Sequence, residues 1–276
     1  MRRLILNADD YAMDAGVDQA ILSLIARNTV TASSAMVLSP RWSEAAGEIG
    51  AMNADCGLHL DLTSEFAAAK LTTPSLPDLI ARSYAGRLGT AAIRDAIEAQ
   101  LDVFEAALGR SPDFVDGHQH VHQLPVIRVQ LIEALRRRYG ADAGRIGIRI
   151  CTPRRWRGAK AQTIGLLGAG PMARLAHRYG HTVNSDFVGV YDFSPGADLP
   201  LLWRRWLAGM QGDLPLAMCH VATGGPSAIA DPIRPARIKE LAWLASDAFH
   251  DLCAERGIAL SRHSLVTGKA TFGNSA

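Results

Sequence analysis

The chain has 276 residues, of which 48% are hydrophobic and 20% are charged, a balance that excludes a disordered protein and allows a sizeable core. The formal net charge is only +2, and no stretch interleaves basic with aromatic residues, so nucleic acid is not an expected partner. No run approaches the roughly 18 apolar residues of a membrane-spanning helix, and the start turns polar at Asn7 before a signal peptide could form. We therefore expect a cytoplasmic protein with no membrane partner.

Runs with strand character alternate with stretches of helical periodicity. In chain order the first half predicts a strand at Leu4–Leu6, a helix at Asp14–Ala26, a strand at Thr31–Leu38, a helix at Ser43–Met52, a strand at Cys56–Leu62, a helix at Thr90–Leu108 and a strand at Phe114–Asp116. The second half predicts a helix at Pro125–Arg138, strands at Ile146–Ile150, Val183–Val190 and Leu214–His220, a helix at Pro235–Cys253 and a strand at Ile258–Leu260. The least regular segment, Thr152–His181, is expected to be a loop or lid beside the site.

Strands followed by helices over a length near the ~250 residues of such folds predict the α/β class. We expect an irregular, TIM-barrel-like (β/α) barrel, with a doubly wound open sheet as the alternative. Because no linker or internal repeat divides residues 1–276, a single domain is expected.

Two adjacent carboxylates, Asp9 and Asp10, follow the first predicted strand. In α/β folds the carboxyl ends of the strands form the active site. Two neighbouring residues cannot share one face of an extended strand, so as the chain turns one could hold a metal while the other faces a substrate water. The alternative is that one of them only caps the next helix.

Three of the nine histidines, His118, His120 and His122, fall within five residues after another short apolar strand. They share a face if the chain is extended, whereas His118 and His122 lie together if it is helical. Imidazole is the commonest protein ligand for divalent metals. The cluster therefore predicts a metal site, although not all three histidines need be ligands.

Two further strands carry a histidine toward the same edge. His59 shares a strand face with Asp61, which could orient it, although Asp61 could equally be exposed or cap a turn. His220 ends a late apolar strand and suits general acid catalysis on a leaving group. Arg149 lies inside an apolar strand, which is costly unless it pairs with an anion such as a catalytic aspartate.

Taken together, these motifs resemble the YdjC family of carbohydrate deacetylases, to which bacterial chitooligosaccharide deacetylases belong. The resemblance covers most of the chain. It rests on the ordered set Asn7-Ala8-Asp9-Asp10-Tyr11, Thr31-Ala32-Ser33, Gly57-Leu58-His59, Asp116-Gly117-His118-Gln119-His120-Val121-His122 and Met218-Cys219-His220. One departure is Tyr11-Ala12, where the family usually has Phe-Gly.

The resemblance implies a barrel-like fold and a divalent ion, magnesium or zinc. It assigns Asp10, His59 and His118 as the ligands of that ion. Asp9 would be the general base and His220 the general acid. The roles of His120 and His122 stay open; His122 could replace or supplement a ligand.

The expected reaction is metal-assisted hydrolysis of the N-acetyl group of an acetylated amino sugar or chitooligosaccharide, with release of acetate. One alternative is a metal-dependent phosphoesterase or amidohydrolase, which two close metals would favour. Another is a non-catalytic carbohydrate-binding protein, which would not need Asp9. The acetylated sugar is the expected partner, and whether the chain forms a homodimer is open.

Overall fold

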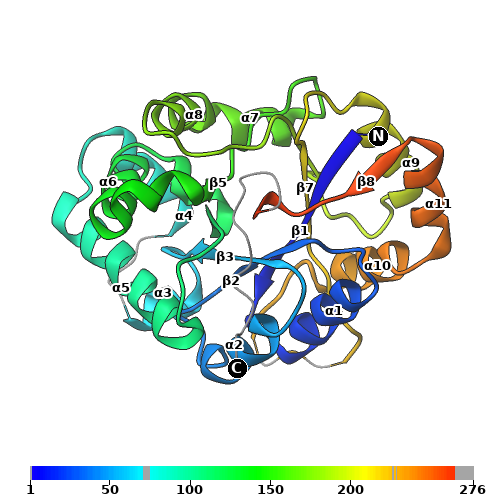
Figure 1. The fold of residues 1–276 in the computed structure, drawn as a ribbon, viewed down its shortest axis with the longest axis horizontal. Coiled ribbons are helices and arrows are strands. Elements are labelled where there is room, and N and C mark those ends of the chain that lie inside the picture. The colour runs from blue at the N-terminus through cyan, green and yellow to red at the C-terminus, as the bar shows by residue number, and fades with distance from the viewer. Residues whose placement is uncertain (1, 71–74, 226, 228, 265–276) are drawn as a thin grey trace.

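Parallel strands form the centre of the molecule and helices surround them (Figure 1). The computed structural model describes residues 2–70, 75–225, 227 and 229–264. The strands are β1 (Arg2–Tyr11), β2 (Ala32–Ala35), β3 (Asp55–Leu60), β4 (Phe114–Gly117), β5 (Gly147–Ile148), β6 (Phe187–Val188), β7 (Leu216–Cys219) and β8 (Ile258–Leu260). Their order is β5-β4-β3-β2-β1-β7-β6, with β8 pairing with β1.

Strand β1 pairs with three other strands, β2, β7 and β8. Its Arg2–Leu4 segment pairs with β8, and its Ile5–Ala8 segment pairs with β7. Leu4, Leu6 and Ala8 belong to the apolar cluster that includes the surrounding helices, whereas Ile5 belongs to a second cluster with residues of other strands. Both faces of β1 are therefore buried, one against the surrounding helices and the other against side chains of the other strands.

The sheet curls into a half-barrel, which confirms the predicted irregular (β/α) barrel. Within the described residues, β5 and β6 lie at the two ends of the strand order and an isolated bridge joins Ile148 to Val183. No helix in the described part of the chain is long and apolar enough to cross a membrane.

The surrounding helices differ from the prediction in four places. The helices are α1 (Ala15–Ala26), α2 (Trp42–Gly50), α3 (Glu65–Lys70), α4 (Leu76–Tyr84), α5 (Thr90–Leu108), α6 (Ile127–Tyr139), α7 (Ala159–Leu166), α8 (Ala169–Arg178), α9 (Leu199–Gly209), α10 (Arg234–Leu244) and α11 (Asp247–Glu255), with short 3₁₀ segments η1 (His118–Gln123) and η2 (Gly140–Arg145). The prediction omitted α3 and α4, and it also omitted α9. It expected a loop or lid at Thr152–His181, which instead contains α7 and α8, separated at Gly168 (φ 123°). The helix predicted over Pro235–Cys253 is two helices, because the Ser246 hydroxyl caps α11 by accepting a hydrogen bond from the Phe249 N–H.

Candidate active site

The two aspartates at the end of β1 both line one pocket because the strand is interrupted there. The pairing of β1 with β2 shifts register between Ala8 and Tyr11. Asp10 has φ 71°, in the left-handed region that costs a non-glycine residue about 1–3 kcal/mol. Without this turn Asp10 would point to the face opposite Asp9. The Asp18 carboxylate holds the turn by accepting a hydrogen bond from the Ala12 N–H at 2.7 Å.

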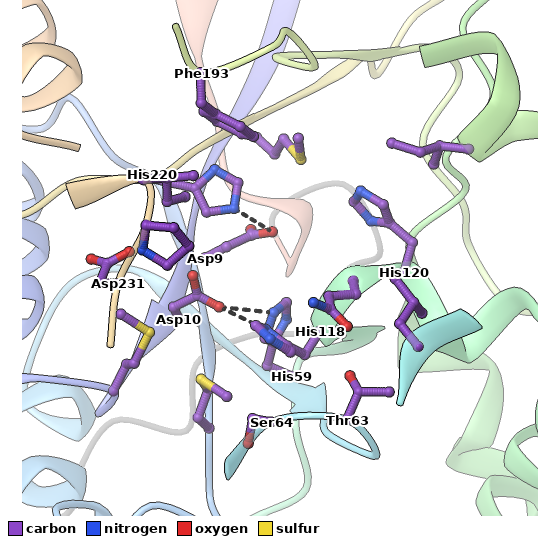
Figure 2. Close-up of a pocket in the computed structure, with 18 of the residues that line it drawn as sticks. Asp9, Asp10, His59, Thr63, Ser64, His118, His120, Phe193, His220 and Asp231 are labelled. Carbon is purple, nitrogen blue, oxygen red and sulfur yellow. Dashed lines mark hydrogen bonds and ion pairs between the residues drawn. The ribbon is translucent and has the colours of Figure 1, made fainter. Parts of the chain in front are cut away.

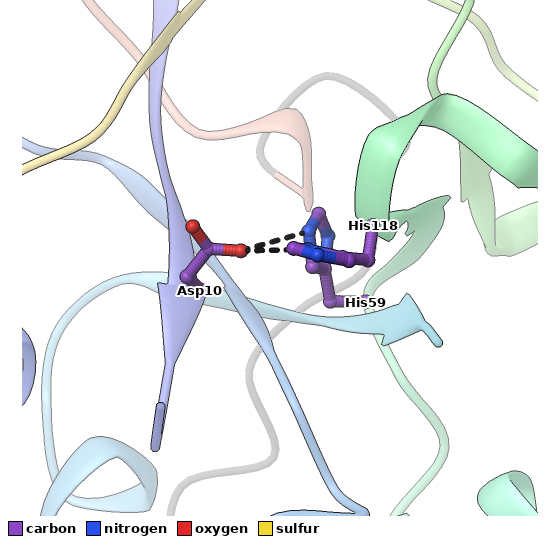
Figure 3. Close-up of side chains that lie close together, drawn as sticks. All are labelled: Asp10, His59 and His118. Carbon is purple, nitrogen blue, oxygen red and sulfur yellow. Dashed lines mark hydrogen bonds and ion pairs between the residues drawn. The ribbon is translucent and has the colours of Figure 1, made fainter. Parts of the chain in front are cut away.

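Asp10, His59 and His118 converge from β1, β3 and η1 (Figure 3). His59 Nε2 lies 3.3 Å and His118 Nδ1 3.1 Å from the same oxygen, Asp10 Oδ1. One ligand atom from each residue lies within 4.8 Å of the other two. A carboxylate and two imidazoles on one face leave other positions open, which is a donor set typical of catalytic divalent ions.

His59 is oriented by Asp116 rather than by Asp61. Its Nδ1 donates to Asp116 Oδ1 at 2.7 Å, which turns Nε2 toward Asp10. Burial alone would lower the pKa of His59, but Asp116, Asp10 and Asp9 outweigh burial and raise that pKa to about 10. The position therefore stabilises positive charge, and a carboxylate behind a ligating imidazole is the usual support of a metal site.

The Asp61 carboxylate does not reach His59. It accepts hydrogen bonds from the backbone N–H groups of Thr63 and Ser64 at 3.1 and 3.0 Å. Asp61 therefore holds the turn that leads into α3, which is the capping alternative left open by the sequence.

A second acidic group, made of Asp9, His59 and Asp116, is less suited to a cation. The guanidinium of Arg149 already occupies it, donating to both oxygens of Asp9 at 2.7 and 2.8 Å and lying 2.5 Å from Asp116 Oδ2. All of these side chains are buried. The predicted pairing of Arg149 with an aspartate is confirmed, and a metal here would displace a buried cation. The geometry therefore favours one ion, at Asp10, His59 and His118.

The three histidines of the cluster point in different directions, so they share neither a strand face nor a helical face. Gln119 and His120 both have left-handed φ values, 51° and 61°. His118 faces Asp10, and His120 lines another wall of the pocket. His122 Nε2 bonds the Arg149 carbonyl at 2.9 Å, and His122 belongs to neither ligand group found among the described residues. His122 therefore lies outside both groups, and its ring instead holds the backbone at Arg149.

His220 lies across the pocket from the histidine pair. Its Nε2 is 4.0 Å from Asp9 Oδ2. Its ring packs edge-on against the Phe193 ring, with 5.2 Å between the two ring centroids (Figure 2). Burial lowers the pKa of His220 to about 4. Burial alone would raise the pKa of Asp9, but Arg149 outweighs it and holds that pKa well below its usual value. At neutral pH the pair is thus a carboxylate facing a neutral imidazole.

These groups line a cavity of about 740 Å³, large enough for a small-molecule substrate. Polar side chains for hydroxyl recognition, such as Ser64, Gln123 and Thr163, line it together with apolar ones such as Leu124 and Phe193. The segment expected to be a lid contributes through α7, which places Thr163 in the wall.

The sequence did not predict a role for three side chains that contact the site residues. Asp116 was quoted only as part of a motif, although it stands directly beside His59 in the register of β3 with β4. Arg237 donates to Asp10 Oδ2 at 2.6 Å, and Glu240 accepts from the His220 N–H at 3.1 Å. The available signal for the last two was a pair of charges on the buried face of α10.

Glu240 predicts a pH-dependent stability. Burial raises its pKa from 4.5 to about 8. A carboxyl whose pKa is raised by folding stabilises the fold fully below its unfolded pKa, and that contribution is lost as the pH rises toward about 8. Glu240→Gln cannot ionise, so its unfolding free energy should exceed that of the wild type increasingly between about pH 5 and pH 8, by a few kcal/mol. Denaturant unfolding across this range measures the difference; a pH-independent difference would contradict the prediction.

A family model described as YdjC-like protein matches residues 3–255. This chain belongs to the YdjC-like family. Among its relatives, the chitooligosaccharide deacetylase of Yersinia pestis (strain Pestoides F) is 30% identical over 268 residues, covering 93% of this chain and 96% of the relative. The carbohydrate deacetylase of Mus musculus is 34% identical over 146 residues, or 48% of this chain and 47% of the mouse protein.

Solved structures share the fold of this YdjC-like chain. A protein of Enterococcus faecalis V583, for which a role in cellobiose-phosphate cleavage has been suggested, superimposes with a TM-score of 0.70 at 21% identity, covering 96% of this chain and 98% of that one. A peptidoglycan N-acetylglucosamine deacetylase superimposes with a TM-score of 0.53 at 11% identity, covering 94% of this chain and 85% of the other. Both likenesses support the barrel-like architecture.

Proposed function

We propose that this chain is a metal-dependent carbohydrate deacetylase that removes the N-acetyl group from an acetylated amino sugar and releases acetate. The observation that carries the proposal is the convergence of Asp10, His59 and His118 beside the facing pair Asp9 and His220 in one cavity. The relative named chitooligosaccharide deacetylase, aligned over 93% of the chain, supports the same reaction.

Asp10, His59 and His118 would hold a divalent ion, magnesium or zinc. When bound, such an ion polarises the amide carbonyl and lowers the pKa of a coordinated water. Hydrogen bonds orient two of these ligands. Arg237 donates to Asp10 Oδ2, and His59 Nδ1 donates to Asp116. Asp10 Oδ1 and His59 Nε2 therefore stay directed at the same point.

Asp9 acts as the general base through one particular oxygen. Oδ1 already accepts from Asn7 Nδ2 and from Arg149 Nη2, both at 2.7 Å. Oδ2 accepts only from Arg149 Nη1 among the hydrogen bonds described for it, and it is the oxygen that faces His220. Because Arg149 keeps Asp9 ionised, Oδ2 is available to receive the proton of the attacking water.

His220 serves as the general acid after it gains a proton. With a pKa of about 4 it is neutral at neutral pH, so it cannot start the reaction as an imidazolium. The water's proton passes from Asp9 Oδ2 to His220 Nε2, two atoms that lie 4.0 Å apart and must approach to hydrogen-bond distance for the transfer. The ring then donates it to the amide nitrogen as the C–N bond breaks. The hydroxyl stays on the carbonyl carbon, so acetic acid forms, and it leaves as acetate once its proton has passed to the free amine.

Two alternatives receive less support. A two-metal phosphoesterase would need an ion in the group that Arg149 occupies. A carbohydrate-binding protein without turnover would not require an ionised Asp9, which the buried ion pair with Arg149 maintains.

Acetate release tests the proposal. The zinc-loaded protein is incubated with N-acetylglucosamine, N,N′-diacetylchitobiose and longer acetylated chitooligosaccharides, with and without a chelator, beside p-nitrophenyl phosphate. We expect acetate from at least one acetylated sugar and its loss on chelation. Turnover of the phosphate ester with no acetate from any sugar would overturn the proposal.

A further inference from the structure

Helix α10 directs two buried charged side chains at the site. Arg237 and Glu240 are one turn apart and therefore lie on the same face of the helix. Each is only 3% exposed. Charged side chains are rarely buried so deeply unless they are paired, so their partners indicate what they do.

Arg237 bridges two carboxylates. Its Nη2 donates to Asp10 Oδ2 at 2.6 Å, and its Nε lies 3.0 Å from Asp231 Oδ2. With Oδ2 tied to Arg237, the carboxylate of Asp10 can present only Oδ1 to His59 and His118. Asp231 fixes the guanidinium from the other side and lies beside Asp10 in the pocket wall (Figure 2).

Glu240 holds the backbone at His220. Its Oε2 accepts from the His220 N–H at 3.1 Å, and its Oε1 accepts from the Tyr191 hydroxyl at 2.8 Å. His220 is the first residue after β7, where the sheet no longer fixes the chain. Glu240 therefore supplies the hydrogen bond that sets the position from which the imidazole reaches toward Asp9.

We infer that α10 is a positioning element with two separable roles. Arg237 aims the Asp10 carboxylate at the ion, and Glu240 aims His220 at Asp9. The inference rests on the proposed function for the reaction that these residues serve. It predicts that substitutions one turn apart on the same helix affect different quantities, metal affinity in one case and kcat in the other.

The role of Arg237 is tested by zinc binding without any substrate. Arg237→Met should weaken zinc binding by about 10- to 100-fold in calorimetry, and Arg237→Lys, which keeps one donor for Asp10, should recover part of the loss. Removing a buried positive charge would by itself favour a bound cation, so weaker binding reports lost orientation. The matched control is Arg157→Met, which removes another ion-paired arginine, whose side chain is 6% exposed and lies 2.7 Å from Asp186, and it should leave zinc affinity unchanged. Zinc binding by Arg237→Met as tight as in the wild type, or tighter, would overturn this role.

The role of Glu240 is tested by a pair of variants. Glu240→Ala should lower kcat by about 10-fold or more while zinc affinity and KM stay near wild type, because only the proton-transfer geometry is lost. Glu240→Gln can still accept from the His220 N–H and should restore most of kcat. Circular dichroism confirms that both variants are folded. An unchanged kcat in Glu240→Ala, or an equal loss in Glu240→Gln, would overturn this role.

The two proposals fail differently. A wild-type chain that binds zinc but releases no acetate from any sugar contradicts the deacetylase function, and the zinc affinities of the Arg237 variants still decide the role of α10 at the metal. Acetate release with identical zinc affinity in wild type and Arg237→Met overturns that role and leaves the deacetylase function standing.

Discussion

Asp9→Asn should lower kcat by about 10²- to 10⁴-fold while the metal content of the protein stays close to that of the wild type. An amide keeps the shape of the carboxylate but cannot take the proton of the attacking water. Asp9 is not one of the three proposed ligands, so the ion should be retained. Steady-state acetate release, together with metal analysis of the purified variant, measures both quantities.

The substitution also breaks a buried ion pair with Arg149, which by itself costs about 3–5 kcal/mol of stability. Asp186→Asn is the matched control, because it breaks the buried pair of Asp186 with Arg157, which does not line the pocket. The control should lose similar stability and keep its kcat. If Asp9→Asn strips the metal, Asp9 is a ligand and the assignment of roles is wrong.

His59→Ala should lose metal and activity together, with kcat/KM falling by about 10³-fold at stoichiometric zinc. The variant removes one of three ligands and leaves Asp116 without the imidazole it orients. Excess zinc should restore part of the activity, because Asp10 and His118 remain. Metal content and acetate release are measured over a zinc series.

His250→Ala serves as the control for this variant, since His250 bonds Thr29 at 3.0 Å on the outside of the barrel and does not line the pocket. It should match the wild type in metal content and rate. If His59→Ala retains the metal content of the wild type, His59 is not a ligand and the ion binds at another site.

The sequence predicted the strand-end residues well, and there is a physical reason. In a parallel sheet the carboxyl ends of all strands meet at one edge, so Asp10, His59 and His118 could be brought together from three strand ends without knowledge of the helices. The same logic placed His220 at the pocket and Arg149 beside an aspartate. Local pattern and topology predicted that these residues lie at one edge of the sheet, and the resemblance to the YdjC family selected Asp10, His59 and His118 as ligands.

Other features depend on tertiary structure and could not be predicted in this way. The left-handed turn at Asp10 is strained and is held by the Asp18 carboxylate of α1, a contact that the strand pattern did not indicate. The partner of His59 depends on the register of β3 with β4, which selects Asp116 over Asp61. The spacing of the three histidines predicted that they share a face. The left-handed backbone at Gln119 and His120 turns their side chains in different directions. Arg237 and Glu240 look like surface charges until α10 is packed on the site.

Metal titration of acetate release tests the central claim most directly. The metal-free protein is titrated with zinc, and the rate of acetate release from an acetylated chitooligosaccharide is followed against the zinc added per chain. We predict no activity without metal, a linear rise, and a plateau at one ion per chain, which Asp10→Ala abolishes. Full activity in the metal-free protein, or a plateau only at two ions per chain, would contradict the account.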